Sequence, residues 1–277
     1  MKFNLMSLGD HITDPVTGFR PTAQGRHRDF VTMAVRAEDA GFHGVNVGEH
    51  HGIEYIYSSP PVMLAAIAER TRTLRLGTAV TLLANLDALR IAEDYATLDS
   101  LSGGRVDVVS GRGNFFATTY ELFGHPLAES KDRFAENAEL LDELWRGKPV
   151  HWSGRFRAAI SGERLQPPPV QEAREALWIG GGSSSESVDL AARLGWKLML
   201  PSSFGRPAGL LRGHRRALPG AVGRARARAR SRGRRRLAPV RRQGQPGRAG
   251  AVGTALPGVS RVDAAATGEG KPGRARP

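Results

Sequence analysis

The sequence contains no cysteine, and this absence excludes both disulfide bonds and metal sites built from thiolates. No apolar run approaches the roughly 20 residues that a membrane-spanning helix needs. The apolar stretch at residues 3–8 is too short for the apolar core of a signal peptide. A chain without cysteine also fits a reducing compartment. We therefore expect a cytoplasmic protein with no membrane partner.

Two further signatures of cofactor and metal sites are missing from the sequence. No Gly-x-Gly-x-x-Gly follows the first apolar run, so there is no fingerprint of a nicotinamide dinucleotide site. His50 and His51 are adjacent, but no His-x-His or His-x-x-x-His pair accompanies them. Neighbouring residues of a strand point to opposite faces, so these two side chains are poorly placed to share a metal. We expect no metal site.

The charge of the chain is divided unevenly along its length. Of the formal net charge of +13, residues 205–277 carry +17, and the first 204 residues therefore carry −4. An evenly basic protein would suggest a nucleic acid or an anionic surface as its partner. Here that signal belongs to the C-terminal 73 residues alone.

Short apolar runs and amphipathic segments alternate through the first 204 residues. The runs lack strict polar alternation, which is typical of strands buried on both faces of a parallel sheet. We expect strands at Lys2–Leu8, Gly44–His50, Leu74–Val80, Val106–Gly111, Leu177–Gly181 and Trp196–Pro201. The segments between them predict five helices, and the longer connection at residues 148–176 predicts an inserted loop or small hairpin. Such alternation predicts either an open doubly wound sheet or three quarters of an eight-stranded barrel.

The pattern ends near residue 204, and a tail rich in Arg, Gly, Ala and Pro follows. This composition cannot bury enough apolar surface to offset the entropy of ordering, so we expect residues 205–277 to be disordered. Translation of a GC-rich gene in a shifted reading frame would produce such a tail. The alternative is a genuine basic arm that binds nucleic acid or anionic membranes. Domain organisation is thus expected to be residues 1–204 and a separate tail.

A glycine-rich segment leads from the fifth predicted strand into the last predicted helix. It reads Trp178-Ile-Gly-Gly-Gly-Ser183-Ser-Ser-Glu186-Ser187, with Ser183 and Glu186 at the spacing of a capping box. Backbone N–H groups at a helix N-terminus, flanked by serine hydroxyls, can hold a phosphate. An ordinary glycine loop with a helix cap would explain the same residues.

Two other segments follow predicted strands at the end where α/β enzymes place their sites. Arg112 lies between two glycines after the fourth strand, and a guanidinium suits a phosphate by bidentate bonding. A surface arginine in a turn is the alternative. His50 closes the second strand, where a histidine can donate or accept a proton near neutral pH. A structural hydrogen-bonding role is its alternative.

Taken together, these segments resemble the bacterial luciferase-like, flavin-dependent monooxygenases over residues 1–204. The resemblance rests on five motifs in order: Gly48-Glu-His-His51, Ala92-Glu-Asp-Tyr-Ala-Thr-Leu-Asp-Ser-Leu-Ser-Gly-Gly-Arg105, Gly111-Arg-Gly113, Phe123-Gly124 and the segment Ser183–Gly195. It implies a TIM-type (β/α)8 barrel, of which this chain would hold six of the eight units. The tail has no counterpart of the last two.

The resemblance also implies the cofactor and its binding residues. Reduced FMN would be held by its phosphate at Arg112, Ser183, Ser184 and Ser187. Ala79 and Val80 match the stretch that lies under the flavin ring, and His50 matches the active-site histidine. The expected partners are O₂, a small organic substrate and a separate flavin reductase. The family is often dimeric, and the resemblance leaves the oligomeric state of this chain open between a monomer and a homodimer. The deazaflavin F420 is the alternative cofactor, and an inactive truncated chain whose tail binds polyanions is the alternative function.

Overall fold

The computed structural model describes residues 1–113, 116–181 and 184–200. Six parallel strands form its main sheet in the order β1-β2-β3-β4-β7-β8. All six predicted strands are confirmed. Their bounds are β1 Asn4–Ser7, β2 Gly44–Val47, β3 Arg75–Thr78, β4 Val106–Ser110, β7 Leu177–Gly180 and β8 Lys197–Met199. The strand order and parallel pairing are those of an incomplete TIM-type barrel, as the resemblance implied.

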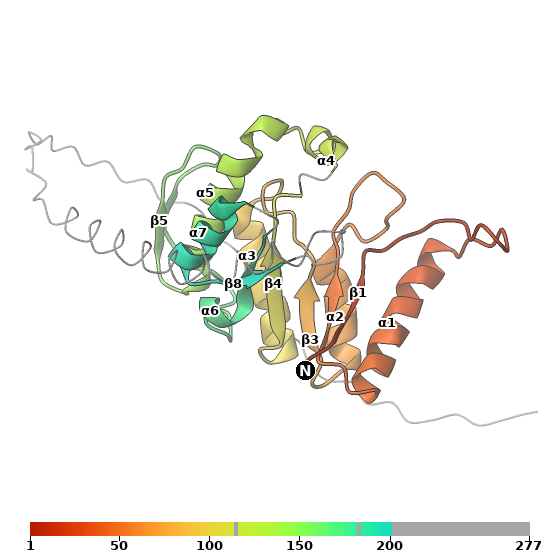
Figure 1. The fold of residues 1–277 in the computed structure, drawn as a ribbon. Helices are drawn as coiled ribbons and strands as arrows, with labels where there is room; N and C mark the ends of the chain where they lie inside the picture. The colour runs from red at the N-terminus through yellow and green to blue at the C-terminus, as the bar shows by residue number, and fades with distance from the viewer. Residues whose placement is uncertain (114–115, 182–183, 201–277) are drawn as a thin grey trace, which may run out of the picture. The chain divides into compact units, whose positions relative to one another are not determined.

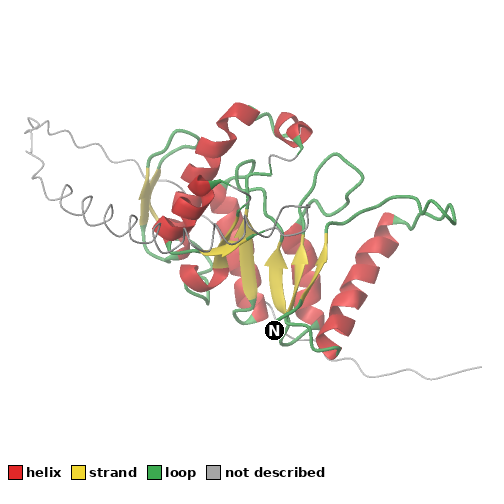
Figure 2. Cartoon of the chain, in the orientation of Figure 1, coloured by secondary structure: helices red, strands yellow, loops and turns green. Residues whose placement is uncertain are grey.

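The helices follow the strands and pack beside one another in the order α1-α2-α3-α5-α7 (Figure 1). All five predicted helices are confirmed. Their bounds are α1 Ala23–Asp39, α2 Pro60–Arg70, α3 Ala88–Ser102, α5 Ser130–Trp145 and α7 Ser185–Leu194. Figure 2 shows the sheet and this helical layer as separate layers. Helices connecting neighbouring parallel strands are the arrangement from which barrels and doubly wound sheets are built.

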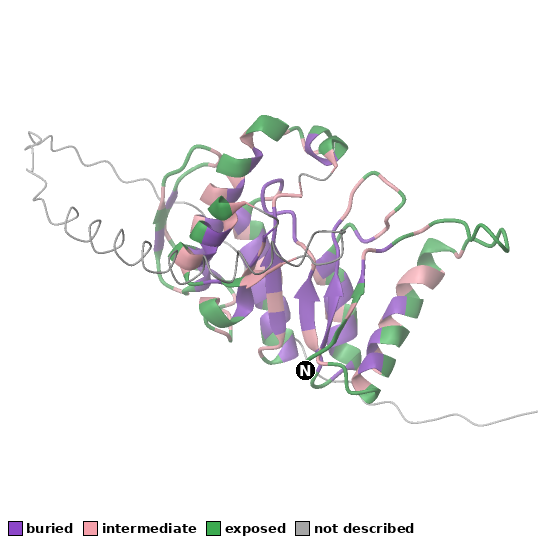
Figure 3. Ribbon diagram, in the orientation of Figure 1, coloured by how far each residue is buried: buried purple, intermediate pink, exposed green. Residues whose placement is uncertain are grey.

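The hydrophobic core lies between the sheet and the helices (Figure 3). Alternate strand residues face the helices, and their neighbours face the other side of the sheet. The fully buried side chains include Val45, Leu76, Val108 and Ile179 from the strands, and Phe30, Leu64, Tyr95 and Leu141 from the helices. None of the helices within the described ranges is long and apolar enough to span a membrane.

Local sequence explains where several of these helices begin and end. Helix α3 begins after Asp87, whose carboxylate accepts hydrogen bonds from the backbone N–H groups of the helix's first turn. It ends at Gly103, which takes the left-handed conformation with φ of 66°. Gly195 ends α7 in the same way, with φ of 76°. Ser59 and Pro60 open α2, although the Ser59 side chain makes no capping hydrogen bond.

The connection at residues 148–176 contains the predicted small hairpin. Strands β5 (Val150–Trp152) and β6 (Ile160–Glu163) pair antiparallel and form a sheet of their own. Three short elements were not predicted: α4 (Ala117–Leu122), η1 (Leu127–Glu129) and α6 (Ala173–Ala176). Each is too short to show the apolar periodicity on which a sequence-based prediction depends.

Candidate active site

The carboxyl ends of the parallel strands lie along one edge of the sheet, and the loops that follow them carry the predicted residues. Because β2, β3, β4 and β7 are neighbours, residues up to 134 positions apart in the sequence fall on four adjacent loops. His50 follows β2, Ala79 and Val80 follow β3, Arg112 follows β4, and Ser184 follows β7. This edge is where enzymes of this architecture place their sites.

His50 lies in an aromatic cluster at the end of β2. Its imidazole stacks on Tyr55 with 4.5 Å between the ring centroids, and Phe116 contacts it edge-on at 5.7 Å. The His50 Nδ1 atom is buried, and no described residue meets it in hydrogen-bond geometry. Neither aromatic neighbour could be assigned from sequence, because Phe116 reaches His50 only through the pairing of β2, β3 and β4.

This environment favours the neutral form of His50. Burial lowers the pKa of His50, the carbonyl of Leu8 opposes that shift, and the nearby His51 adds to it. A buried histidine that is neutral near pH 7 can accept a proton. The geometry and the pKa direction therefore suit His50 to the proton-transfer role suggested for it.

The lowered pKa of His50 should appear in the pH dependence of stability. Below its ordinary value of 6.5, the unfolded chain binds more protons than the folded protein, so acidification destabilises the fold. Between about pH 7 and about pH 5, the wild type should therefore lose more free energy of unfolding than His50→Gln does. Urea unfolding of both proteins at a series of pH values measures this difference. Parallel pH curves would contradict the burial of a neutral His50.

Ala79 and Val80 lie between the ends of β2 and β4. The N–H group of Ala79 donates to the carbonyl of Val47, and the peptide bond between Ala79 and Val80 is cis. Both residues are only partly buried, so they present apolar surface at this edge. Val80 packs where Gly111 and Gly180 have no side chain: a Cβ on either glycine would lie 2.5 Å from a Val80 methyl carbon.

This close packing predicts a specific compensation between Val80 and Gly180. Gly180→Ala would force the added methyl group against Val80, and overpacking of this kind costs about 1–3 kcal/mol. Val80→Ala should restore most of that loss in the double variant, because it removes the methyl groups in the way. A double-mutant cycle from urea unfolding measures the coupling. Additive effects would show that the two residues do not meet.

Arg112, Ser184 and Ser187 line one cavity of about 290 Å³, and helices α5 and α7 form most of its wall. Ser184 and Ser187 belong to the start of α7, and their hydroxyl oxygens lie 3.1 Å apart. Tyr120 of α4 donates a hydrogen bond to the backbone carbonyl of Arg112 and so fixes the loop that carries it. The guanidinium of Arg112 makes no ion pair with the described residues. The structure thus brings together three of the four residues expected at a phosphate.

The fourth, Ser183, lies outside the described residues. The prediction that Ser183 caps α7 is wrong by one position. Ser184 is the N-cap, and its hydroxyl accepts a hydrogen bond from the N–H group of Ser187. Glu186 pairs with Lys131 at 3.0 Å instead of closing a capping box. Because several serines occur in a row, spacing alone could not select the cap.

Two further cations line the same cavity, and the sequence analysis missed both. Lys131 lies in the first turn of α5 and Arg193 near the end of α7. They pair with Glu186 and Glu139, which neutralise them in the absence of a ligand. Only the packing of α5 against α7 brings them here, so no sequence motif could reveal them.

The residues present fit an FMN group. A phosphate needs cationic and hydrogen-bonding partners, and the cavity offers Arg112, two serine hydroxyls and the first turn of a ten-residue helix. An isoalloxazine ring needs apolar surface, which Ala79 and Val80 supply. Unpaired polar atoms also remain at the strand ends, since both Nδ1 of His50 and Oγ of Ser110 are buried without a described partner.

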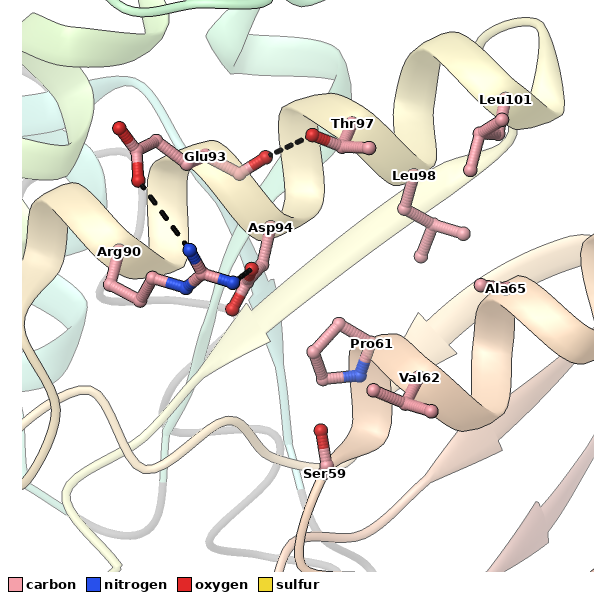
Figure 4. A pocket seen from close by; sticks show the side chains of 10 residues that line it. All are labelled: Ser59, Pro61, Val62, Ala65, Arg90, Glu93, Asp94, Thr97, Leu98 and Leu101. Atoms are coloured by element: carbon pink, nitrogen blue, oxygen red, sulfur yellow. Dashed lines mark hydrogen bonds and ion pairs between the residues drawn. The ribbon is translucent and has the colours of Figure 1, made fainter.

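A second hollow lies on the outer side of the helical layer and does not belong to this site. It is a groove of about 330 Å³ between α2 and α3, with Val62 and Leu101 on its apolar side (Figure 4). Its one arginine, Arg90, is paired with Asp94 at 2.7 Å and approaches Glu93 at 3.9 Å. None of the predicted cofactor-binding or catalytic residues lines it.

Comparison with known proteins identifies the family. The family model described as luciferase-like monooxygenase matches residues 1–241. N-acetyl-S-alkylcysteine monooxygenase of Bacillus subtilis is 30% identical over 177 residues, which are 63% of this chain and 50% of that protein. The oxygenase component of the flavin-dependent trigonelline monooxygenase of Acinetobacter baylyi is 24% identical over 182 residues, covering 65% and 48%. The chain spans about half the length of the curated relatives it matches.

Solved structures show the same fold. Monooxygenase RslO1 from Streptomyces bottropensis superposes with a TM-score of 0.72 at 30% identity, covering 81% of this chain and 67% of its own. The oxygenating constituent of 3,6-diketocamphane monooxygenase from Pseudomonas putida, in complex with FMN, gives 0.66 at 18%, covering 81% and 63%. An F420-dependent secondary alcohol dehydrogenase gives 0.59 at 20%, covering 79% and 66%. The family match and the shared fold together show that this chain belongs to the luciferase-like monooxygenase family of flavin- or F420-dependent oxidoreductases.

Proposed function

We propose that this chain is an FMN-dependent monooxygenase that uses reduced FMN and O₂ to oxidise a small organic substrate. The observation that carries the proposal is the convergence of Arg112, Ser184 and Ser187 on one cavity. These residues come from two loops more than 70 positions apart. Together they form an anion site at the edge of the sheet where the carboxyl ends of the parallel strands lie, which we call the active edge. FMN carries one phosphate group, and this site offers it the Arg112 guanidinium, two hydroxyls and a helix N-terminus, beside the ion-paired Lys131 and Arg193.

The chain's own residues would orient the cofactor and control its surroundings. Arg112 and the start of α7 would anchor the phosphate, and Ala79 with Val80 would support the ring. Bound flavin would supply the redox chemistry that activates O₂. Tyr55 and Phe116 cover the partly buried His50 imidazole on two sides and would limit its contact with water. His50, neutral at pH 7, would accept or return a proton at its imidazole.

The reduced cofactor is proposed to come from a separate flavin reductase. The first strand is not followed by a glycine fingerprint for a nicotinamide dinucleotide. One relative is named as the oxygenase component of a flavin-dependent monooxygenase, which supports a division between two proteins. We propose that this chain takes the same part.

An anaerobic titration tests the choice of cofactor. The full-length chain is mixed with reduced FMN or with reduced F420, and binding is followed by the absorbance and fluorescence of each. We expect tighter binding of FMN, because the His50 cluster suits it. F420 is the second candidate, since an F420-dependent dehydrogenase has the same fold. Tighter binding of F420 would overturn the proposal.

A further inference from the structure

Glu49 is a buried carboxylate at the centre of the active edge, and no role in the proposed chemistry has been given to it. Its side chain is only 2% exposed. Oε1 accepts a hydrogen bond from His51 Nε2 at 2.8 Å, and Oε2 accepts one from the backbone N–H group of Leu82 at 3.0 Å. Burying a carboxylate is costly unless its oxygens are paired. Both oxygens of Glu49 are paired, and their donors belong to two different loops.

The contact with Leu82 fixes the loop that follows β3. Leu82 ends the short segment that begins with Ala79 and Val80, and its N–H group has Glu49 as acceptor. The Leu82 side chain packs against Gly113, where a Cβ would lie 2.5 Å from a Leu82 methyl carbon. Gly113 is the neighbour of Arg112. Glu49 therefore holds residues 79–82, which lie under the proposed flavin ring. Because Leu82 packs against Gly113, Glu49 also supports the loop that carries Arg112.

The contact with His51 fixes the loop that follows β2. His51 meets the ring of Phe123 edge-on, with 4.8 Å between the centroids and an angle of 88°. Phe123 ends α4, whose Tyr120 holds the Arg112 loop. His50 lies between Glu49 and His51 in the sequence, so a carboxylate bonded to His51 restrains the backbone on both sides of His50.

We propose that Glu49 is the positioning residue that sets His50 relative to the 79–82 segment. The proposal rests on the function proposed above, because the distance that matters is the one between the His50 imidazole and a ring supported by Ala79 and Val80. Glu49 does not touch the cofactor in this account. It acts through His51 on one side and through the Leu82 N–H group on the other.

Two Glu49 variants separate the two contacts. Glu49→Ala removes both and leaves the Leu82 N–H group buried without an acceptor. Glu49→Gln keeps an oxygen for the Leu82 N–H group, and its amide can donate to His51 once that ring moves its proton to Nδ1. The glutamine variant should therefore retain most of the geometry. Should Glu49→Ala not fold, Glu49→Asp takes its place, because its shorter side chain cannot reach both donors.

Glu38 provides a matched control at the opposite edge of the sheet. Its carboxylate accepts hydrogen bonds from the backbone N–H groups of Arg72, Thr73 and Leu74, just before β3 begins. Burial raises the pKa of Glu38, but these N–H groups outweigh burial and lower it. Like Glu49, it is a carboxylate that fixes a loop. Glu38→Ala should lose stability without changing the active edge.

Two measurements on the full-length chain test the proposal. The first is the ¹H–¹⁵N spectrum of the histidine imidazoles without any cofactor, and the second is the dissociation constant of FMN. Glu49→Ala should shift the His50 nitrogen signals and weaken FMN binding about tenfold, which corresponds to about 1.4 kcal/mol. Glu49→Gln should stay within about threefold of the wild type, with its main spectral change at His51. Glu38→Ala should change neither measurement.

The outcomes distinguish this proposal from the proposed function. If the His50 nitrogen signals shift no more in Glu49→Ala, or in Glu49→Asp where that variant replaces it, than they do in Glu38→Ala, Glu49 has no positioning role. This conclusion does not depend on whether the wild type binds FMN. If the His50 signals move but the wild type binds no FMN, the positioning role stands and the proposed function fails. Movement of the His50 signals together with a selective loss of FMN affinity supports both.

Discussion

Replacing His50 by glutamine is expected to slow the reaction of bound reduced FMN with O₂ by about 10²-fold or more, the range for a positioned acid or base. The FMN dissociation constant should stay within about threefold of the wild type, because His50 is not among the residues that line the phosphate cavity. Glutamine keeps a polar side chain of similar reach but cannot exchange a proton near neutral pH. The measurement is stopped-flow absorbance after mixing the reduced complex with oxygenated buffer.

The control for this experiment is Tyr55→Phe. This variant keeps the ring that stacks on His50 at 4.5 Å and removes only its hydroxyl group. It should react at close to the wild-type rate. The pH profile adds a second criterion: the wild-type rate should change as the proton on His50 is gained or lost, below pH 6.5, and the variant should lack that change. Equal rates and equal profiles in the wild type and His50→Gln would make His50 a structural residue.

Arg112→Ala is expected to cause the largest loss of cofactor affinity. A hydrogen bond to a charged group contributes about 1.5–3 kcal/mol, so the FMN dissociation constant should rise by roughly 10- to 100-fold. Arg112→Lys should recover part of that loss, because a lysine supplies the charge without the two-pronged geometry. Fluorescence titration of the full-length variants with FMN measures both.

Two arginines serve as controls for Arg112. Arg90 lies in the outer groove between α2 and α3, and Arg90→Ala should bind FMN as the wild type does. Arg193 lines the phosphate cavity but is already paired with Glu139, so Arg193→Ala should have a smaller effect than Arg112→Ala. Were all three variants to bind FMN equally well, the phosphate would have to lie elsewhere.

The sequence was sufficient for the strands, the main helices and their order. The runs of β2, β3 and β4 became strands because burial on both faces of a parallel sheet demands continuous apolar residues. The edge strands β1 and β8 are more exposed than that reasoning predicts. Glycines at 103 and 195 ended helices where an L-residue would be strained. The choice between an open sheet and a barrel was different, since both satisfy the same periodicity. It required the resemblance, and the family match confirmed it.

Some residues of the candidate site were predicted from the sequence and others were missed, for a physical reason. His50, Arg112 and the serines were found because each follows a strand directly, and parallel strands end at one edge. Tyr55, Phe116, Lys131 and Arg193 were missed because they reach the site from loops and helices whose packing leaves no periodic signal. Glu49 was seen as part of a motif, but its bond to the Leu82 N–H group depends on the β2–β3 pairing.

The central claim is that the cavity lined by Arg112, α5 and the start of α7 holds the phosphate of a flavin. Comparing the affinities of the wild-type chain for FMN and for riboflavin tests it most directly, since the two ligands differ only in that phosphate. The account predicts that FMN binds at least about tenfold more tightly than riboflavin, as expected for one or more charge-assisted hydrogen bonds. Equal affinity for the two ligands would contradict it.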